Sequence, residues 1–201
     1  MIAVDLGRRM VEGLFAPSRA AREILEARLT LQTGVLFVVL SFLLSAMISI
    51  VMRLMLLEEP SGPSLGGYVL GLISAFVRVG LFGVAIWWGG RLFGGEGARD
   101  QALILVAWHA VVTAPLEILV NLVALELAAV MPNPGDPVDP EAMAEISQIV
   151  LLLALYAGFQ YLWTLACFTK ELHGFSQPWG TMGVMVACTA LFGQFLIAIS
   201  S

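Results

Sequence analysis

The residues best suited to acid–base chemistry follow one another at intervals of four in one apolar stretch. They are His109, Thr113, Glu117 and Asn121, and residues four apart share one face of a helix. His109 and Glu117 lie about 12 Å apart along such a helix, too far for direct proton transfer. Pro115 interrupts the stripe, removes one backbone hydrogen bond and predicts a helix kink. The stripe therefore predicts either a polar face that fixes helix packing or a path for a proton or cation.

Four further polar side chains lie in similarly apolar surroundings. They are Arg53, Arg78, Glu126 and Gln160. Counting from the centre of each apolar segment puts Arg78 and Glu117 at the same depth, which predicts an ion pair. Arg53 and Glu126 match in depth roughly 14 Å farther out and form a second candidate pair, although two glutamates soon after Arg53 compete for it. Gln160 lies near mid-depth, where it could face the polar stripe.

The sequence carries no set of residues that is typical of a metal or cofactor site. Its two histidines and two cysteines form no CxxC pair or other ligand cluster. The zinc-protease pattern HExxH is absent, and the glycine run at 94–97 lacks the setting of a phosphate-binding loop. We therefore expect no catalytic residue, no metal and no cofactor. A lipid-modifying enzyme is the least favoured of three functions that we consider.

The composition that surrounds these residues is that of a membrane protein. Of 201 residues, 59% are hydrophobic and 12% charged, whereas soluble domains average about 45–50% and about 25%. Ten Lys and Arg face fifteen Asp and Glu, so a basic surface for nucleic acid is not expected. The apolar segments do not alternate as barrel strands do. Helices are then the only way to satisfy the backbone in lipid, and we expect an all-α fold.

Five apolar segments are long enough to cross a bilayer, which needs roughly 20 residues in a helix. They lie at about 31–57, 65–93, 101–131, 146–170 and 179–199. We expect a polytopic membrane protein in which residues 31–201 form a bundle of five transmembrane helices. Charged or proline-rich connectors separate these segments and cannot continue a helix through lipid.

Residues 1–30 mix apolar and charged side chains at helical spacing. Ser18 could cap a short helix that leads into the first apolar segment. We expect an amphipathic segment at the cytoplasmic interface of the membrane. A docking surface for a cytoplasmic partner is the alternative interpretation.

The basic residues are concentrated on one side of the expected spans. Eight of the ten are Arg8, Arg9, Arg19, Arg22, Arg28, Arg91, Arg99 and Lys170. The two loops on the other side, at 58–64 and 131–145, carry only acidic charges. Positive charge marks the cytoplasmic side, which predicts a cytoplasmic N-terminus. After five spans the C-terminus lies on the opposite side.

Four short motifs stand before and between the expected spans. They are FAPSRAAREIL at 15–25, LFGGEGARDQAL at 92–103, VAWHA at 106–110 and APL at 114–116. Together they resemble the Yip1 domain family in its bacterial form. The first is similar to the family's proline and short helix before span one. The second resembles its glycine-rich loop after span two, and the last two resemble the start of span three. Arg99, Ala114 and Pro115 correspond to family pattern residues only.

The resemblance implies a non-enzymatic integral membrane protein of the bacterial inner membrane. Eukaryotic members are Golgi and endoplasmic-reticulum proteins that bind Rab GTPases, partners that bacteria lack. We expect a scaffold or accessory subunit that binds a membrane protein or a second copy of itself. Gly94, Gly95 and Arg99 are the candidate partner contacts in the cytoplasmic loop. The alternative is a small transporter or channel component with a proton or cation relay centred on Glu117.

Overall fold

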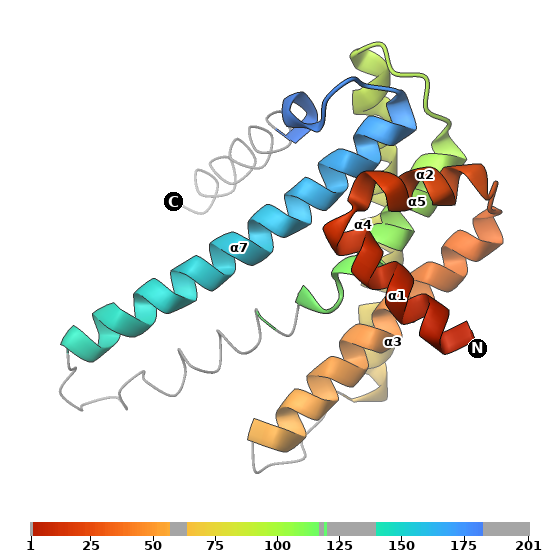
Figure 1. The fold of residues 1–201 in the computed structure, drawn as a ribbon. Coiled ribbons are helices and arrows are strands. Elements are labelled where there is room, and N and C mark those ends of the chain that lie inside the picture. The colour runs from red at the N-terminus through yellow and green to blue at the C-terminus, as the bar shows by residue number, and fades with distance from the viewer. Residues whose placement is uncertain (1, 57–63, 117–118, 120–139, 183–201) are drawn as a thin grey trace, which may run out of the picture.

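A computed structural model describes residues 2–56, 64–116, 119 and 140–182 of the chain (Figure 1). Within these ranges every regular element is an α-helix, as the sequence predicts. The helices are α1 (Ile2–Phe15), α2 (Pro17–Glu26), α3 (Leu31–Leu56), α4 (Leu65–Leu92), α5 (Arg99–Thr113) and α7 (Pro140–His173).

Three of these helices are long and apolar enough to cross a membrane. The qualifying ranges are Leu31–Val51, Leu65–Leu92 and Val150–His173, and they coincide with the first, second and fourth predicted segments. Their large apolar side chains face outward, for example Leu36, Leu70 and Leu152, which are each about two-thirds exposed. Such exposure is costly in water and favourable in lipid. The fifth predicted segment lies almost wholly outside the described residues, so five spans remain a prediction.

Helix α5 is the centre of the fold. It packs against α3, α4, α7 and both N-terminal helices, and ten of its fifteen residues are buried. Its length of about 22 Å is less than the roughly 30 Å of a bilayer core. The helix ends at Thr113, and residues 114 and 115 form a turn. The expected single helix over 101–131 is therefore interrupted, because Pro115 has no N–H to donate to the preceding turn. Its continuation, and so the kink, lies outside the described residues.

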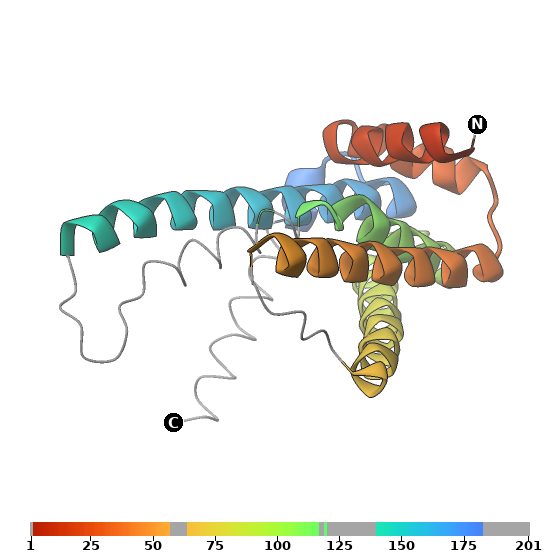
Figure 2. The same cartoon turned by 90° about the horizontal axis from the view of Figure 1, so that it is seen from below.

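The N-terminal helices α1 and α2 form a layer on one flank of the bundle, with α5 between this layer and α4 (Figures 1 and 2). Gly13 permits a close approach here, since a Cβ at this position would lie 2.6 Å from Cγ2 of Val112. Helix α2 buries Ala20, Ala21 and Ile24 on the same side. The apolar faces of the amphipathic segment are thus used against protein. Its position at the membrane interface stays a prediction.

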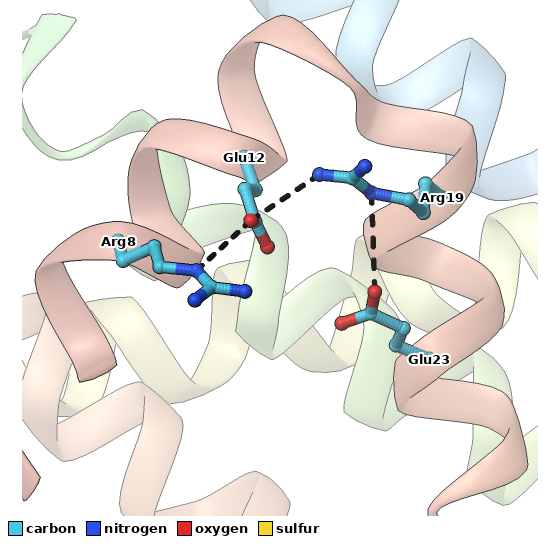
Figure 3. Close-up of polar contacts among 4 residues, drawn as sticks. All are labelled: Arg8, Glu12, Arg19 and Glu23. Carbon is cyan, nitrogen blue, oxygen red and sulfur yellow. Dashed lines mark hydrogen bonds and ion pairs between the residues drawn. The ribbon is translucent and has the colours of Figure 1, made fainter.

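A chain of ion pairs runs along α1 and α2, and one of them, Glu12 with Arg19, joins the two helices (Figure 3). Glu12 Oε1 lies 3.1 Å from Arg8 Nε and 3.2 Å from Arg19 Nη2. Arg19 Nε in turn lies 3.9 Å from Glu23 Oε1. Exposed pairs of this kind contribute about 0–1 kcal/mol each. They orient the corner between the two helices, and apolar burial beneath them supplies most of the stabilisation.

Helix α7 is longer than the predicted segment of 146–170 at both ends. It covers Pro140–His173, so that His173, which the sequence placed in a connector, belongs to the last helical turn. This extension brings His173 to the loop between α4 and α5, where it takes part in the contacts described below.

Candidate functional site

Polar side chains from four helices line a cavity of about 40 Å³. They are Ser41 and Ser45 of α3, Arg78 of α4, His109 and Thr113 of α5, and Tyr161 of α7. Measured along their helices, all six lie about 15–21 Å from the end of the bundle that carries the α4–α5 loop. The cavity is therefore a polar site near the middle of the expected membrane thickness.

His109 is the most enclosed member of this group, with 1% of its surface exposed. Its Nε2 lies 3.1 Å from the carbonyl oxygen of Tyr161. A carbonyl only accepts, so Nε2 carries the proton and Nδ1 is left as an acceptor in the neutral ring. The imidazole also meets the Tyr161 ring edge-on, with the centroids 4.4 Å apart. His109 thereby joins α5 to α7.

The hydroxyls of the cavity are partly used within their own helices. Thr113 Oγ1 donates to the carbonyl of His109 at 2.8 Å, and Ser41 Oγ donates to the carbonyl of Val38 at 2.9 Å. Each hydroxyl keeps oxygen lone pairs that can accept. These two hydroxyls and Nδ1 of His109 are therefore available as acceptors, and Arg78 is the cationic donor of the lining.

Arg78 lines the cavity while its side chain stays exposed. It forms no ion pair with another residue of the described ranges. Its expected partner Glu117 lies outside those ranges, as do Asn121 and Glu126. Arg53 belongs to α3, but its side chain is not described. Both predicted ion pairs, Arg78–Glu117 and Arg53–Glu126, therefore stay predictions.

Gln160 does not line this cavity, contrary to the expectation that it faces the stripe on α5. Its Nε2 donates to the carbonyl of Leu14 at 2.5 Å, which ties α7 to the last turn of α1. Tyr161, the next residue, takes the place facing His109. Neighbouring residues of a helix point about 100° apart, so a one-residue difference in rotation exchanges their roles.

The glycine-rich loop after α4 begins with a Schellman turn. Gly94 has a φ of +82°, which residues with a side chain rarely adopt. Its N–H bonds to the carbonyl of Arg91, and the N–H of Gly95 bonds to the carbonyl of Gly90. These are the two bonds that define the motif and satisfy the last carbonyls of the helix.

His173 fills a space that this loop leaves open. Its Nε2 donates to the carbonyl of Ile86 at 3.2 Å, and its Nδ1 accepts from the N–H of Gly97 at 3.3 Å. A Cβ at Gly90 or Gly95 would collide with the imidazole ring. The glycines thus form a cradle for His173, here called the glycine cradle and comprising Gly90, Gly95 and Gly97.

The glycine cradle changes the interpretation of the loop. Gly95 was a candidate partner contact, but it is buried against His173. Gly94 and Arg99 remain exposed. Only these two of the three candidates are accessible to another protein from the described part of the chain.

One further sequence pattern belongs to a helix cap. Residues 62–66 read Gly-Pro-Ser-Leu-Gly, which matches the GxSxG spacing of many serine hydrolases. Ser64 is the N-cap of α4, and its hydroxyl accepts from the N–H of Gly67 at 3.2 Å. A capping role explains Ser64 without any chemistry.

Sequence reasoning missed Ser41, Ser45, Tyr161 and His173 as members of polar clusters. Ser41 and Ser45 share the four-residue spacing of the stripe on α5, so the same rule would have found them. The glycines at 90, 95 and 97 carried no comparable signal, because their partner is 76 residues away from Gly97.

In a comparison with known families, the model of the Yip1 domain matches residues 12–199. No curated protein and no solved structure matches the chain. The matched range contains α2, the polar cavity and the glycine cradle.

Proposed function

Since this chain belongs to the Yip1 domain family, we propose that it is a scaffold or accessory subunit for other membrane proteins. The family is not known for enzymatic activity. The length and apolar composition of α3, α4 and α7 indicate an integral membrane protein. We place it in a bacterial inner membrane on its resemblance to the bacterial form of the family. The distribution of basic residues supports a cytoplasmic N-terminus and a C-terminus on the opposite side.

The main support for this proposal is that polar side chains of the bundle bind the backbone of neighbouring elements. His109, Gln160 and His173 each hydrogen-bond to the backbone of another element. Such bonds between membrane helices are worth about 0.6 kcal/mol each and fix their rotation and register. A bundle whose polar groups serve packing is suited to presenting a fixed surface to a partner.

The accessible part of the cytoplasmic side supports a partner surface there. Phe15 is 78% exposed at the corner between α1 and α2, and Val11 is 55% exposed one turn earlier. Arg8 and Arg19, three residues before Val11 and four after Phe15, are also exposed, as is Arg99 at the start of α5. Exposed aromatic and arginine side chains are typical of interface centres. The partner is a membrane protein or a second copy of the chain.

The experiment is affinity capture of the full chain in lipid nanodiscs, with mass spectrometry of the proteins retained. We expect a stoichiometric partner, and the double variant Phe15→Ser, Arg99→Glu should reduce its recovery at least tenfold, the effect of about 1.4 kcal/mol. Leu65→Ser is the matched control, because Leu65 is equally exposed at the other end of α4. Absence of any stoichiometric partner, or equal loss in both variants, would contradict the scaffold.

A second function, a proton or cation relay, draws support from the cavity that holds Arg78 and His109. Ionisable groups at membrane depth often mark such paths. The test is ion flux into liposomes that contain the purified protein. Flux that Glu117→Gln abolishes, with the fold retained, would replace the scaffold by the relay. If Arg78→Glu with Glu117→Arg instead restores folding, the pair is structural.

A further inference from the structure

A separate cavity of about 240 Å³ lies between α2, the linker to α3 and the start of α5. Its walls are mainly apolar, and two polar side chains complete its lining. The residues are Ile24, Leu25, Arg28, Leu29, Gln101 and Ile104. At about 30 Å³ per water molecule, the volume corresponds to about eight waters. It is large enough for a phosphate group with the glycerol part of a lipid.

The cavity lies where the membrane boundary is expected. Leu29 stands two residues before α3, whose first residue also begins a candidate span. Gln101 belongs to the first turn of α5, and the starts of α3 and α5 are adjacent, since a Cβ at Gly34 would lie 3.3 Å from Ile104. Headgroup phosphates occupy this depth, between the hydrocarbon core and water.

Arg28 is the unusual residue of the lining. It has a φ of +47°, directly after the C-cap Ala27 of α2. Glycine is the preferred residue for this left-handed position, because a Cβ there costs about 1–2 kcal/mol. Arg28 is exposed and forms no ion pair within the described ranges. The backbone is thus strained at a residue whose charge the described protein does not use.

The first turn of α5 carries Arg99 and Asp100, whose charges cancel, so any further attraction for an anion comes from its backbone N–H groups. Its N-cap is Ala98, and no side chain caps the helix. The uncapped N–H groups favour an anion, as does the helix dipole. Gln101 brings an amide donor from the same turn into the cavity.

We propose that this cavity binds one anionic phospholipid, with its phosphate between Arg28 and Gln101. The upper part of an acyl chain then packs on the apolar wall formed by α2 and Ile104. A guanidinium and a phosphate form short, charge-assisted hydrogen bonds, frequently in a bidentate fork. The inference is independent of the scaffold function and concerns a lipid that would hold the α2–α3 corner at the membrane surface.

The test is native mass spectrometry of the full chain released from detergent micelles, titrated with dimyristoyl phosphatidylglycerol. We expect one lipid to bind with an affinity that Arg28→Gly lowers at least about tenfold. Because glycine suits the left-handed position, this variant should keep or raise the thermal stability of the protein. Arg28→Lys should retain most of the binding. Arg91→Gln, which removes an exposed charge from the last turn of α4, is the matched control and should leave it unchanged.

A second variant tests the apolar wall while the charge is kept. Leu25→Trp puts a larger ring into the cavity and should also lower the lipid affinity about tenfold. Equal losses in Arg28→Gly and Arg91→Gln would show only diffuse attraction to the charged surface and would overturn the site. Full competition by inorganic phosphate would overturn the lipid as its ligand, and so would equal binding of dimyristoyl phosphatidylcholine that does not depend on Arg28.

Discussion

At the scale of single residues, the bundle depends on side chains that reach the backbone of a neighbouring helix. His109 illustrates why this works in lipid, since its ring contributes one donor to Tyr161 O and one edge-on contact to the Tyr161 ring. In hydrocarbon a lost donor is not replaced by water. The imidazole thus contributes both an apolar contact and a hydrogen bond that fixes the rotation of α5 against α7.

Replacing His109 by Phe should separate these two contributions. The ring volume is retained, while the hydrogen bond to α7 is lost, so we expect a destabilisation of about 1 kcal/mol. His109→Gln keeps a donor and should lie between wild type and His109→Phe. Unfolding by SDS in mixed micelles measures both. A stability of His109→Phe equal to or above wild type would contradict the role of the hydrogen bond.

The glycines of α4 offer a sharper comparison, because two neighbours differ in surroundings. A Cβ at Gly90 would meet the ring of His173, whereas a Cβ at Gly89 meets nothing within 4 Å. His173 is held on both ring nitrogens and cannot easily move. Gly90→Ala should therefore destabilise by about 1–3 kcal/mol. Gly89→Ala should stabilise by roughly 0.5–1 kcal/mol. Thermal unfolding in detergent distinguishes them, and equal effects would rule out the glycine cradle.

At the scale of helices, α1 packs Leu6, Met10 and Leu14 on the core, and two close contacts add to this apolar face. Gly13 meets Val112 of α5, and Leu14 accepts from Gln160 of α7. The remaining contacts of α1 with α2 include the exposed pair of Glu12 with Arg19, which contributes little. Removing one attachment should therefore loosen α1 without unfolding the spans.

Gln160→Met removes the donor to Leu14 and should speed amide hydrogen exchange in α1 several-fold. Exchange in α3 should stay unchanged, because local opening follows local contacts. Gln148→Met is the control, since Gln148 is exposed on the same helix. Unchanged exchange in α1 would show that apolar contacts alone hold it.

The bounds of α3 and α4 could be predicted from the sequence almost to the residue. Both are long apolar runs, and each is followed by charged, proline-containing or glycine-rich residues. The end of α5 at Thr113 was harder, because hydropathy registers apolar content and not the backbone N–H that Pro115 lacks. The start of α7 at Pro140 was missed for a related reason. Its first turns are polar and follow a run of prolines, but Pro is well tolerated at the start of a helix.

At the scale of the whole molecule, the sequence predicts which residues lie at the same depth in the membrane, but not which of them are in contact. Depth follows from counting along a helix at 1.5 Å per residue. The rotation of α3 and α4 about their own axes cannot be predicted, because a helix that is apolar all round has no preferred face. The meeting of Arg78, His109 and Ser45 therefore required the structure. The contact of His173 with the α4–α5 loop also required the structure, because the two are separated by 76 residues of sequence.

The orientation of the chain in the membrane is a prediction at this scale. In a background with Cys167→Ala and Cys188→Ala, Arg99→Cys should react with a membrane-impermeant thiol reagent from the cytoplasmic side only. Asp139→Cys should react from the opposite side only. Labelling of both cysteines from one side would contradict the single span predicted between Arg99 and Asp139, and the reverse pattern would contradict the direction of insertion.

The distance along the chain between Gly97 and His173 also has a consequence for synthesis. The ring that fills the glycine cradle lies 76 residues downstream of Gly97. At about 5–20 residues per second, the ribosome needs roughly 4–15 s to add them. Residues 99–113 of α5 are added early in that interval, so α4, the loop and α5 are synthesised several seconds before the ring that fills the cradle. A nascent chain arrested before residue 173 should therefore expose a site that insertion factors can occupy and that the finished protein closes by itself.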